Sequence, residues 1–272
     1  VIVLGNVNSS LVVNLWNQNW NVEMENGTQV SSVYTNVLPP FRDLAEDRLV
    51  GLVNLTRIHD TSCAQCSSIE PIINSLKQAG VVVKNERTVE YNSAEGQQLI
   101  SAFGVKEIPA TVISKEVLDY PAVAEIWSQL NATEKNGSYA LHVLQPPYRS
   151  LPENRIVGLV DVIYLNDSSC TNCYNVLIHR EILGTNFGIY LANETVVDLN
   201  STAGKSVLSR YNITVVPTFV MSPDAKYYTG LNQVWPSVGT VDSGWYVFRN
   251  VTVIGGIYKD LSTGKTIVPA GG

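Results

Sequence analysis

Charged residues are scarce in this sequence. Asp, Glu, Lys and Arg make up 15% of its 272 residues, and the net charge at pH 7 is −6. An ordinary globular protein is about one-quarter charged. The negative balance gives no reason to expect nucleic acid as a partner, because surfaces that bind nucleic acid are rich in Lys and Arg.

Long apolar runs are also lacking. No stretch approaches the roughly 18 consecutive apolar residues of a membrane-spanning helix, so the sequence predicts no membrane span. There is no basic segment followed by an apolar run, and so no signal peptide is visible. Because the first residue is Val1 rather than methionine, removal of a signal or anchor segment stays open.

Cysteine is rare, and its placement is informative. The four cysteines form two Cys-x-x-Cys pairs, Cys63 with Cys66 and Cys170 with Cys173. The pairs lie too far apart in sequence to form a compact zinc ribbon, so no metal is expected.

The two pairs belong to an internal repeat. Residues 39–66 align without a gap to 146–173, and half of the 28 positions are identical. After one extra residue the register resumes, and the later matches are 81–96 with 189–204 and 103–113 with 211–221. A period of 107–108 residues suits a small domain better than a solenoid repeat.

Each copy predicts alternating strands and helices. In the first copy, residues 48–58 form an apolar, β-rich run directly before the dithiol, and the apolar residues between 69 and 76 recur at helical spacing. The order β, dithiol, α, β, α, Pro-β, α indicates an α/β fold. The later elements are expected at 81–83, 97–103, 108–113 and 121–130, with a helix at 174–183 and a strand at 215–220 in the second copy.

The segments outside the repeat are expected to be β-rich. Residues 1–36 carry strand-like runs and an Asn26-Gly27 turn signal, and we expect this extension to pack on the first copy. Residues 131–145 are interpreted as a linker. Residues 225–272 depart from the first copy and carry a hairpin turn at 262–264. The expected domains are an N-terminal β extension (1–36), a first domain (37–142), and a second domain with a β-rich tail (143–272).

These features resemble the thioredoxin fold over about residues 45–125 and 152–222. A strand leads into Cys-x-x-Cys, Pro71 follows Cys66 by five residues, and Ile108-Pro109-Ala-Thr follows after 43. Two such units in tandem resemble the protein disulfide oxidoreductases of hyperthermophilic archaea and, more loosely, protein disulfide isomerases. The sequence departs from the family in having Ser62 and Ser169, rather than tryptophan, before each pair.

The resemblance implies the chemistry of the site. Each pair would close as a disulfide, Cys63–Cys66 and Cys170–Cys173. Cys63 and Cys170, placed at helix N-termini, would be the exposed thiolates that attack, and the deeper Cys66 and Cys173 would resolve the mixed disulfide. Pro109 and Pro217 would be cis and would offer backbone for pairing with a protein substrate.

Asparagine is abundant, and its setting indicates glycosylation. The chain has 24 Asn, 23 Ser and 18 Thr, so chance predicts about 24 × 41/272, or roughly four, Asn-x-Ser/Thr sequons. Ten are present, which favours a secreted or surface-displayed chain carrying N-linked glycans over the alternative that these residues punctuate turns. The sequons begin at Asn8, Asn26, Asn54, Asn131, Asn136, Asn166, Asn193, Asn200, Asn212 and Asn250.

A few other residues require interpretation. Asp60 and Asp167 match across the repeat and are expected to cap the turns before the dithiols. His59 is interpreted as a strand-end residue, and His142 and His179 lie outside any constellation. The five tryptophans are interpreted as core or interface residues: Trp16, Trp20, Trp127, Trp235 and Trp245.

Two functions fit these features. The first is an extracytoplasmic thiol–disulfide oxidoreductase or isomerase, which exchanges disulfides with protein partners and needs no organic cofactor. The second is a redox-inert, glycosylated scaffold subunit of a cell-surface or membrane-associated assembly, with structural disulfides. The sequence favours the first. The potential of each pair separates the two, because structural disulfides lie below about −300 mV.

Overall fold

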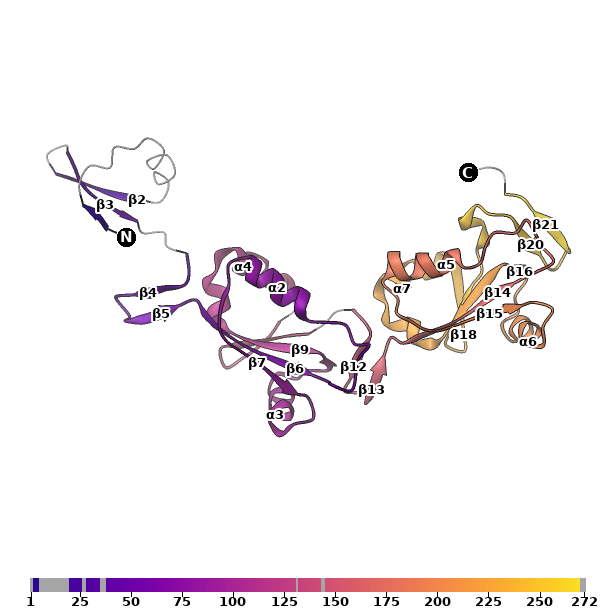
Figure 1. Cartoon of the computed structure of the whole chain (residues 1–272), viewed down its shortest axis with the longest axis horizontal. Coiled ribbons are helices and arrows are strands. Elements are labelled where there is room, and N and C mark those ends of the chain that lie inside the picture. The colour runs from indigo at the N-terminus through magenta and orange to yellow at the C-terminus, as the bar shows by residue number, and fades with distance from the viewer. Residues whose placement is uncertain are drawn as a thin grey trace. The chain divides into compact units, whose positions relative to one another are not determined.

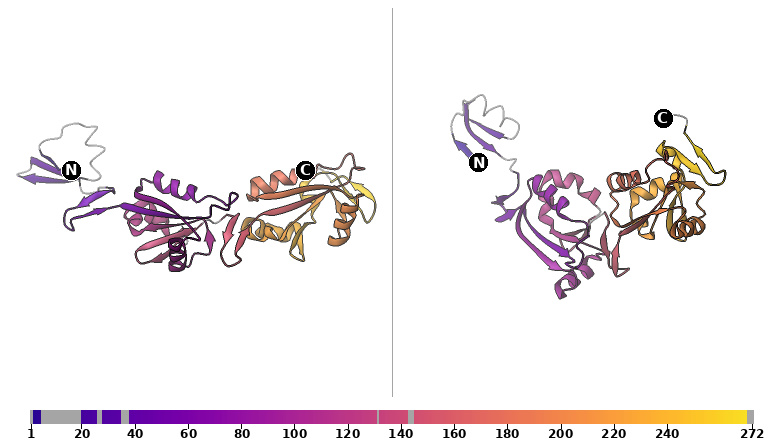
Figure 2. Two further views of the ribbon diagram at one scale, coloured as in Figure 1. Left: turned by 60° about the horizontal axis from the view of Figure 1, so that its bottom comes forward. Right: turned by 45° about the vertical axis from the view of Figure 1, so that its right-hand side comes forward.

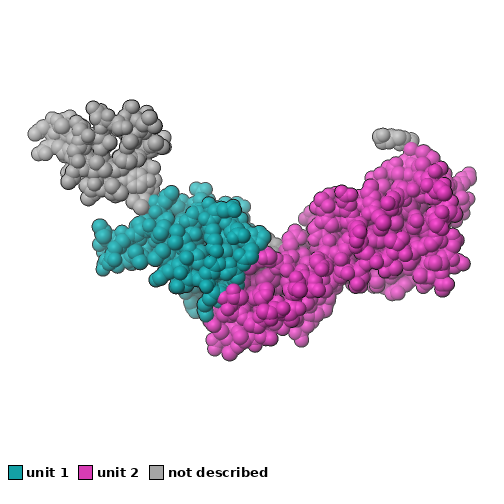
Figure 3. Space-filling model, viewed as in Figure 1, with its two compact units in different colours: residues 1–57, 70–87, 112–141 teal, residues 58–69, 88–111, 142–272 magenta. Residues whose placement is uncertain are grey.

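The computed structural model describes residues 2–4, 20–25, 28–34, 38–130, 132–142 and 145–269. They form a mixed α/β structure with two five-stranded sheets (Figures 1 and 2). The chain divides into two compact units, 1–57 with 70–87 and 112–141, and 58–69 with 88–111 and 142–272 (Figure 3). The dithiol turn at 63–66 therefore groups with the residues after 142.

The first five-stranded sheet is built from residues 52–142. Its strands are β6 (Leu52–His59), β7 (Val82–Glu90), β9 (Ala110–Ser114), β10 (Thr133–Lys135) and β11 (Ser138–His142), and its helices are α2 (Glu70–Gln78), α3 (Ala94–Phe103) and α4 (Pro121–Ile126). The strand order is β10-β11-β9-β6-β7. Helix α2 buries Ile73 and Leu76, two members of the apolar face that the sequence predicts. Helix α3 is capped by the Ser93 hydroxyl, which accepts a hydrogen bond from the Gly96 N–H.

The second five-stranded sheet is built from residues 160–248. Its strands are β14 (Val160–Asn166), β15 (Leu191–Asp198), β17 (Thr218–Met221), β18 (Gly239–Asp242) and β19 (Trp245–Phe248), and its helices are α5 (Ile178–Glu181), α6 (Thr202–Tyr211) and α7 (Thr229–Val238). The order is β15-β14-β17-β19-β18. Strand β14 runs parallel to β15 and antiparallel to β17. Large aromatic side chains, including Tyr164, Phe219 and Trp235, fill its core.

The two sheets have matching strand orders, which corrects two expectations. Residues 131–145 are not simply a linker, because β10 and β11 form a hairpin that belongs to the first sheet. Residues 225–248 do not depart from the first copy, because α7 and the β18–β19 hairpin complete the second sheet in the same way. Both hairpins are short and polar at their tips, and for that reason their sequences resemble loops.

Each copy contains the same tyrosine bridge. The Tyr120 hydroxyl donates to the Gly51 carbonyl at 2.7 Å and accepts from the Val82 N–H at 2.9 Å. In the second copy the Tyr228 hydroxyl donates to the Gly158 carbonyl at 2.7 Å and accepts from the N–H of Tyr190 at 2.8 Å. The two copies therefore share these tyrosine hydrogen bonds as well as their sequence.

Outside the five-stranded sheets, three short hairpins of the described residues follow Pro-Pro or precede the C-terminal end and resemble one another. They are β4–β5 (Phe41–Asp43 and Arg48–Val50), β12–β13 (Tyr148–Ser150 and Arg155–Val157) and β20–β21 (Tyr258–Asp260 and Lys265–Ile267). Strand β12 also pairs with β8 (Glu107–Ile108), and β20 also pairs with β16 (Val215–Val216). The hairpin expected near residues 262–264 is confirmed.

The long strand expected at 48–58 is split between β5 and β6 at Gly51. Gly51 has φ +79°, and a Cβ there would lie 2.3 Å from the Pro39 Cβ. Gly158 repeats this arrangement, with φ +82° and the same 2.3 Å approach to the Cβ of Pro146. A residue with a side chain would be both strained and crowded at either position, so only glycine suits these two corners.

The N-terminal segment also forms a sheet. Strands β1 (Ile2–Leu4), β2 (Trp20–Glu25) and β3 (Thr28–Tyr34) have the order β1-β3-β2. Strands β2 and β3 flank Asn26-Gly27, so the predicted hairpin is confirmed. The strand-like run near residues 9–17 lies outside the described residues. None of the helices in the described ranges is long and apolar enough to cross a membrane.

Candidate functional site: the two dithiol turns

Both Cys-x-x-Cys pairs are closed as disulfides. The Cα atoms are 5.4 Å apart in Cys63–Cys66 and in Cys170–Cys173. The sequence led us to expect both pairs at helix N-termini, but neither pair lies at one. Helix α2 begins at Glu70 and α5 begins at Ile178, so each disulfide lies in the turn that precedes its helix. The helix dipole therefore does not act directly on these sulfurs.

The burial of the cysteines also differs from the expectation. Cys63, the expected exposed attacker, is only 5% exposed. Cys66, expected to be deeper, is half-buried, and so are Cys170 and Cys173. In the first pair the order of exposure is thus the reverse of the prediction.

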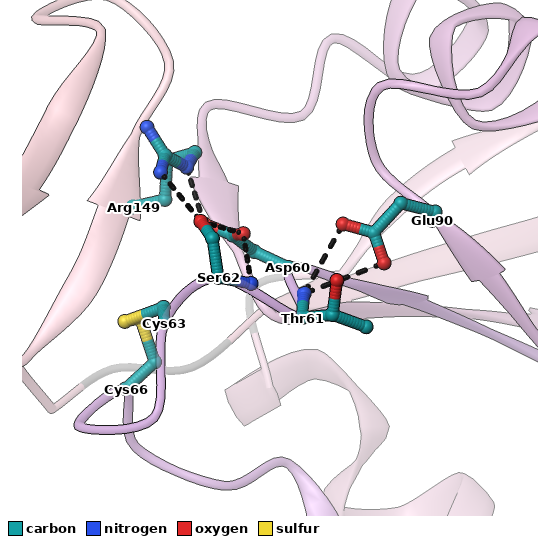
Figure 4. Close-up of a disulfide and its surroundings, with 7 residues drawn as sticks. All are labelled: Asp60, Thr61, Ser62, Cys63, Cys66, Glu90 and Arg149. Carbon is teal, nitrogen blue, oxygen red and sulfur yellow. Dashed lines mark hydrogen bonds and ion pairs between the residues drawn. A yellow bond between two sulfur atoms is a disulfide. The ribbon is translucent and has the colours of Figure 1, made fainter.

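A buried aspartate shapes each turn, and Figure 4 shows the one in the first copy, Asp60. Asp60 is 2% exposed, and its Oδ1 accepts hydrogen bonds from the Ser62 N–H at 2.9 Å and hydroxyl at 2.6 Å. Asp167 is 1% exposed and accepts the same two bonds from Ser169 at 2.9 and 2.6 Å. The interpretation of both aspartates as turn caps is confirmed. Ser62 and Ser169, which directly precede the first cysteine of each pair, are the capped residues.

A cation from a hairpin neutralises each buried aspartate. Arg149 of β12 donates through Nε to Asp60 Oδ2, and Lys259 Nζ of β20 lies 2.6 Å from Asp167 Oδ2. Burial raises the pKa of both carboxyls, but the hydrogen bonds from the cations and serines outweigh it and leave each pKa below its ordinary value. Both aspartates are therefore ionised at neutral pH.

A second carboxylate holds the other side of each turn. Glu90, at the end of β7, accepts a hydrogen bond from the Thr61 N–H at 3.1 Å (Figure 4). Asp198, at the end of β15, accepts one from the Ser168 N–H at 2.7 Å. The bonds from Ser168 and Asn200 lower the pKa of Asp198 to about 2. Two carboxylates thus fix the backbone before each disulfide.

The hairpin that supplies the cation also covers the site with backbone hydrogen bonds. The N–H of Ser67, directly after Cys66, donates to the Pro147 carbonyl at 2.7 Å, and that of Tyr174, directly after Cys173, donates to the carbonyl of Ile257 at 2.9 Å. Arg149 pairs across strands with Ile108, as Lys259 does with Val216. Each hairpin segment therefore bonds both to the residue after the disulfide and to the short strand directly before Pro109 or Pro217.

The two prolines expected to be cis are cis. They are Pro109, after β8, and Pro217, after β16, and both are buried. The residues directly before them already pair with β12 and β20. The role of Pro109 and Pro217 in substrate pairing stays a prediction, and the adjoining backbone edge is occupied by the chain itself.

The second site contains a Tyr–His pair that the sequence analysis missed. The Tyr174 hydroxyl donates to the Pro217 carbonyl at 2.7 Å and lies 3.0 Å from His179 Nε2. His179 is 2% exposed, and burial lowers its pKa to about 4. The first copy gave no signal for this pair, because Ser67 and Ile72 stand at the matching positions.

The histidines and tryptophans that the sequence singles out lie in different environments. His59 ends β6, as expected, and His142 Nε2 lies 3.8 Å from Glu107. Trp127 and Trp235 are buried and Trp245 is half-buried, which fits their interpretation as core residues, whereas the side chains of Trp16 and Trp20 lie outside the described residues. Across the described ranges, no group of three His, Cys, Asp or Glu side chains is placed to hold a metal ion.

The glycosylation candidates are mostly accessible where they are described. Asn166 and Asn250 are half-buried, and Asn8, Asn26 and Asn131 lie outside the described residues. The exposed candidates are Asn54, Asn136, Asn193, Asn200 and Asn212. Glycosylation itself stays a prediction.

Comparison with known proteins adds little. No protein-family model and no curated protein matches the sequence. A similar solved structure is the NTD_N/C domain of alkylhydroperoxide reductase AhpF from Enterococcus faecalis, 14% identical, with 62% of this chain and 81% of that chain covered and a TM-score of 0.18. A cysteine-to-alanine variant of AhpF from the same organism is 17% identical, with 63% and 81% covered and a TM-score of 0.19. TM-scores this low carry no argument about this chain.

Proposed function

We propose that this chain is a structural protein of two tandem thioredoxin-like units, in which Cys63–Cys66 and Cys170–Cys173 are structural disulfides. The order of elements in each copy supports the fold: a central strand, the dithiol turn, a helix, a second strand, a helix and a strand that follows a cis proline. The hairpins support the structural role of the disulfides.

The covering of both dithiol turns is the observation that carries this proposal. A thiol–disulfide oxidoreductase must admit a substrate strand beside its disulfide. Here that position is filled twice, by β12 and by β20, through backbone pairing and a cation bonded to a buried aspartate. To admit a substrate, each hairpin would have to leave a buried carboxylate without its cation, which is costly.

The disulfides and the sequons support a location outside the cytoplasm. Disulfides persist in oxidising compartments, and the sequons are typical of a glycosylated surface or secreted chain. We place the protein outside the cytoplasm, as a glycosylated scaffold within a cell-surface or membrane-associated assembly. Its partners are then other protein subunits, and it needs no cofactor.

Trapping of mixed disulfides tests the proposal. The folded protein is incubated with a small thiol, quenched by alkylation and examined by mass spectrometry. We expect no mixed disulfide at any of the four cysteines. In the Lys259→Glu variant, a mixed disulfide should form at the second pair but not at the first, which serves as an internal control. A mixed disulfide in the unaltered folded protein contradicts the proposal.

Thiol–disulfide exchange at the second pair is the alternative function. Cys170 and Cys173 are both half-buried, whereas Cys63 is buried, so the second disulfide is the more accessible of the two. Exchange would proceed by attack of a partner's thiolate on one sulfur, with release of the other as thiolate. A second thiolate of the partner would then attack the mixed disulfide, which leaves the partner with the disulfide and both cysteines of the pair reduced. The trapping experiment separates this alternative from the structural role.

A further inference from the structure

The three hairpins are related to one another, although only two of them cover a dithiol turn. Each begins with an aromatic residue and has a cation second: Phe41-Arg42, Tyr148-Arg149 and Tyr258-Lys259. Strand β12 has partners on both edges, β13 and β8, and β20 likewise pairs with β21 and β16. The sheet that contains β4 has only two strands, β4 and β5, among the described residues.

The side chains of the first hairpin differ from those of the other two in the manner expected of an unoccupied contact surface. Arg42 pairs with Asp47 at the tip of its own hairpin, and its side chain is 57% exposed, compared with 13% for Arg149. Leu44 is 86% exposed. Its counterpart Leu261 packs on the core of the second sheet, and the Leu261 N–H donates to the Thr214 carbonyl at 2.8 Å.

The N-terminal sheet gives a second, independent indication. The order β1-β3-β2 matches β9-β11-β10 and β17-β19-β18. In chain order, the first strand of each set begins at residue 2, 110 or 218. The last strand begins at residue 28, 138 or 245, which is 26, 28 or 27 residues later. The related hairpin then begins at residues 41, 148 and 258. The segment from β1 to β5 therefore follows the same order as β9 to β13 and β17 to β21.

This corrects the expectation that residues 1–36 have no counterpart in the repeat. In the two complete sheets, β9 and β17 each pair with the hairpin strand on one side and with the central strand, β6 or β14, on the other. Among the described residues, the N-terminal sheet ends at β1, where that central strand would pair. A sheet edge with unpaired backbone groups is a site for strand addition.

We propose that the β1 edge and the β4–β5 hairpin together form the acceptor surface for the first half of a third unit of this repeat. The partner is a segment like residues 159–217: a central strand, an Asp-x-Ser-Cys-x-x-Cys turn, a helix, a strand, a helix and a proline strand. Its central strand pairs with β1. The short strand directly before its proline pairs with β4, as β8 pairs with β12 and β16 with β20, and its turn aspartate binds Arg42. In both complete copies, such a half directly precedes the strand that corresponds to β1.

This proposal does not depend on whether the disulfides exchange. It concerns a surface, whereas the proposed function concerns the chemistry of the cysteines. The covering of Asp60 and Asp167 by a following hairpin is common to both.

The test extends the full chain at Val1 with a second copy of residues 159–217. Hydrogen exchange is followed at residues 20–34 and 41–50, and the added cysteine pair is probed by alkylation under mild reduction. We expect exchange in both segments to slow by about 10-fold or more, because both become part of a packed unit. We also expect the added pair to be reduced no faster than Cys170–Cys173 of the same protein, whatever the rate at that pair is.

Two control extensions make the result specific. In the first, Arg42→Glu in the extended chain should leave the added pair open to reduction, because its turn aspartate would face a like charge. In the second, an extension of the same composition in scrambled order should leave exchange at 20–34 unchanged. Unchanged exchange with the native extension, or an added pair reduced as readily as in urea, overturns the proposal.

Discussion

Lys259 Nζ lies 2.6 Å from Asp167 Oδ2, although the two residues are 92 positions apart in the chain. Arg149 and Asp60 repeat this pair in the first copy, 89 positions apart. Each pair joins a hairpin to the dithiol turn of the sheet before it. One long-range ion pair in each copy therefore adds to the backbone bonds that hold the hairpin over the turn.

Removal of one cation should destabilise the protein because a buried carboxylate loses its partner. We expect Lys259→Ala to lower the free energy of unfolding by about 2–3 kcal/mol, less than for a fully buried pair because the Lys259 side chain is 26% exposed. Urea unfolding measures the change. Lys265→Ala, an exposed lysine on the same hairpin, is the control and should change stability by less than about 0.5 kcal/mol. Equal effects of the two substitutions would show that the ion pair is unimportant.

Acid should destabilise the fold in two ranges of pH. The pKa of His179 is lowered to about 4 from an ordinary 6.5, so the unfolded chain binds the proton more readily and stability falls as pH decreases from 6.5 to 4. A difference of about 2.5 between the two pKa values corresponds to about 3 kcal/mol at most. The lowered pKa values of Asp60, Asp167 and Asp198 add a further loss below about pH 4.

Substitution of the histidine separates these two ranges. His179→Phe keeps an aromatic ring against Phe219 and Phe248 and removes the titrating group. Stability measured by urea unfolding from pH 7 to pH 3 should then be flat above pH 4 and should fall only below it. An unchanged slope between pH 6.5 and 4 would assign that loss to other groups.

The disulfides should contribute modestly to stability. A four-residue loop closed by a disulfide gains only about 2 kcal/mol by the chain-entropy estimate. We expect the Cys170→Ser, Cys173→Ser double variant to fold and to lose about that amount in denaturant unfolding. The matched double variant at Cys63 and Cys66 should lose more, because Cys63 is buried and a serine hydroxyl there needs a partner.

The tyrosine bridges should be worth more than exposed tyrosines. Tyr228→Phe leaves the Gly158 carbonyl and the Tyr190 N–H without their hydroxyl partner, at a cost of about 1–3 kcal/mol. The same reasoning holds for Tyr120 in the first copy. Thermal unfolding measures the loss. Tyr190→Phe is the control, since the Tyr190 side chain is 41% exposed, and its unfolding midpoint should match that of the unaltered protein.

The repeat, the α/β order and the turn-capping aspartates could be predicted from the sequence because each depends on local or repeated signals, whereas the cis prolines were implied only by the family resemblance. Identical residues at matching positions showed the repeat, and the Asp60 and Asp167 turns are local hydrogen-bonding units. The cations that neutralise these aspartates come from hairpins about 90 residues later, and no local pattern marks such a pair.

The N-terminal segment was misjudged for a related reason. Its strand order matches the later sheets, but its sequence does not match theirs well enough to align. Strand pairing depends mainly on backbone groups and tolerates sequence change, so topology can persist after residue identity is lost. The expected position of each disulfide at a helix N-terminus was wrong, because the helices begin four residues after Cys66 and five residues after Cys173.

The reduction potential of each cysteine pair distinguishes structural disulfides from exchanging ones. The folded protein is equilibrated in glutathione buffers of graded potential, alkylated and analysed by mass spectrometry, in parallel with Arg149→Glu and Lys259→Glu. We expect potentials below about −300 mV for both native pairs and a rise only at the pair whose hairpin cation is replaced by glutamate. A potential between about −270 and −120 mV at either pair of the unaltered protein would contradict the structural role of the disulfides and favour exchange chemistry.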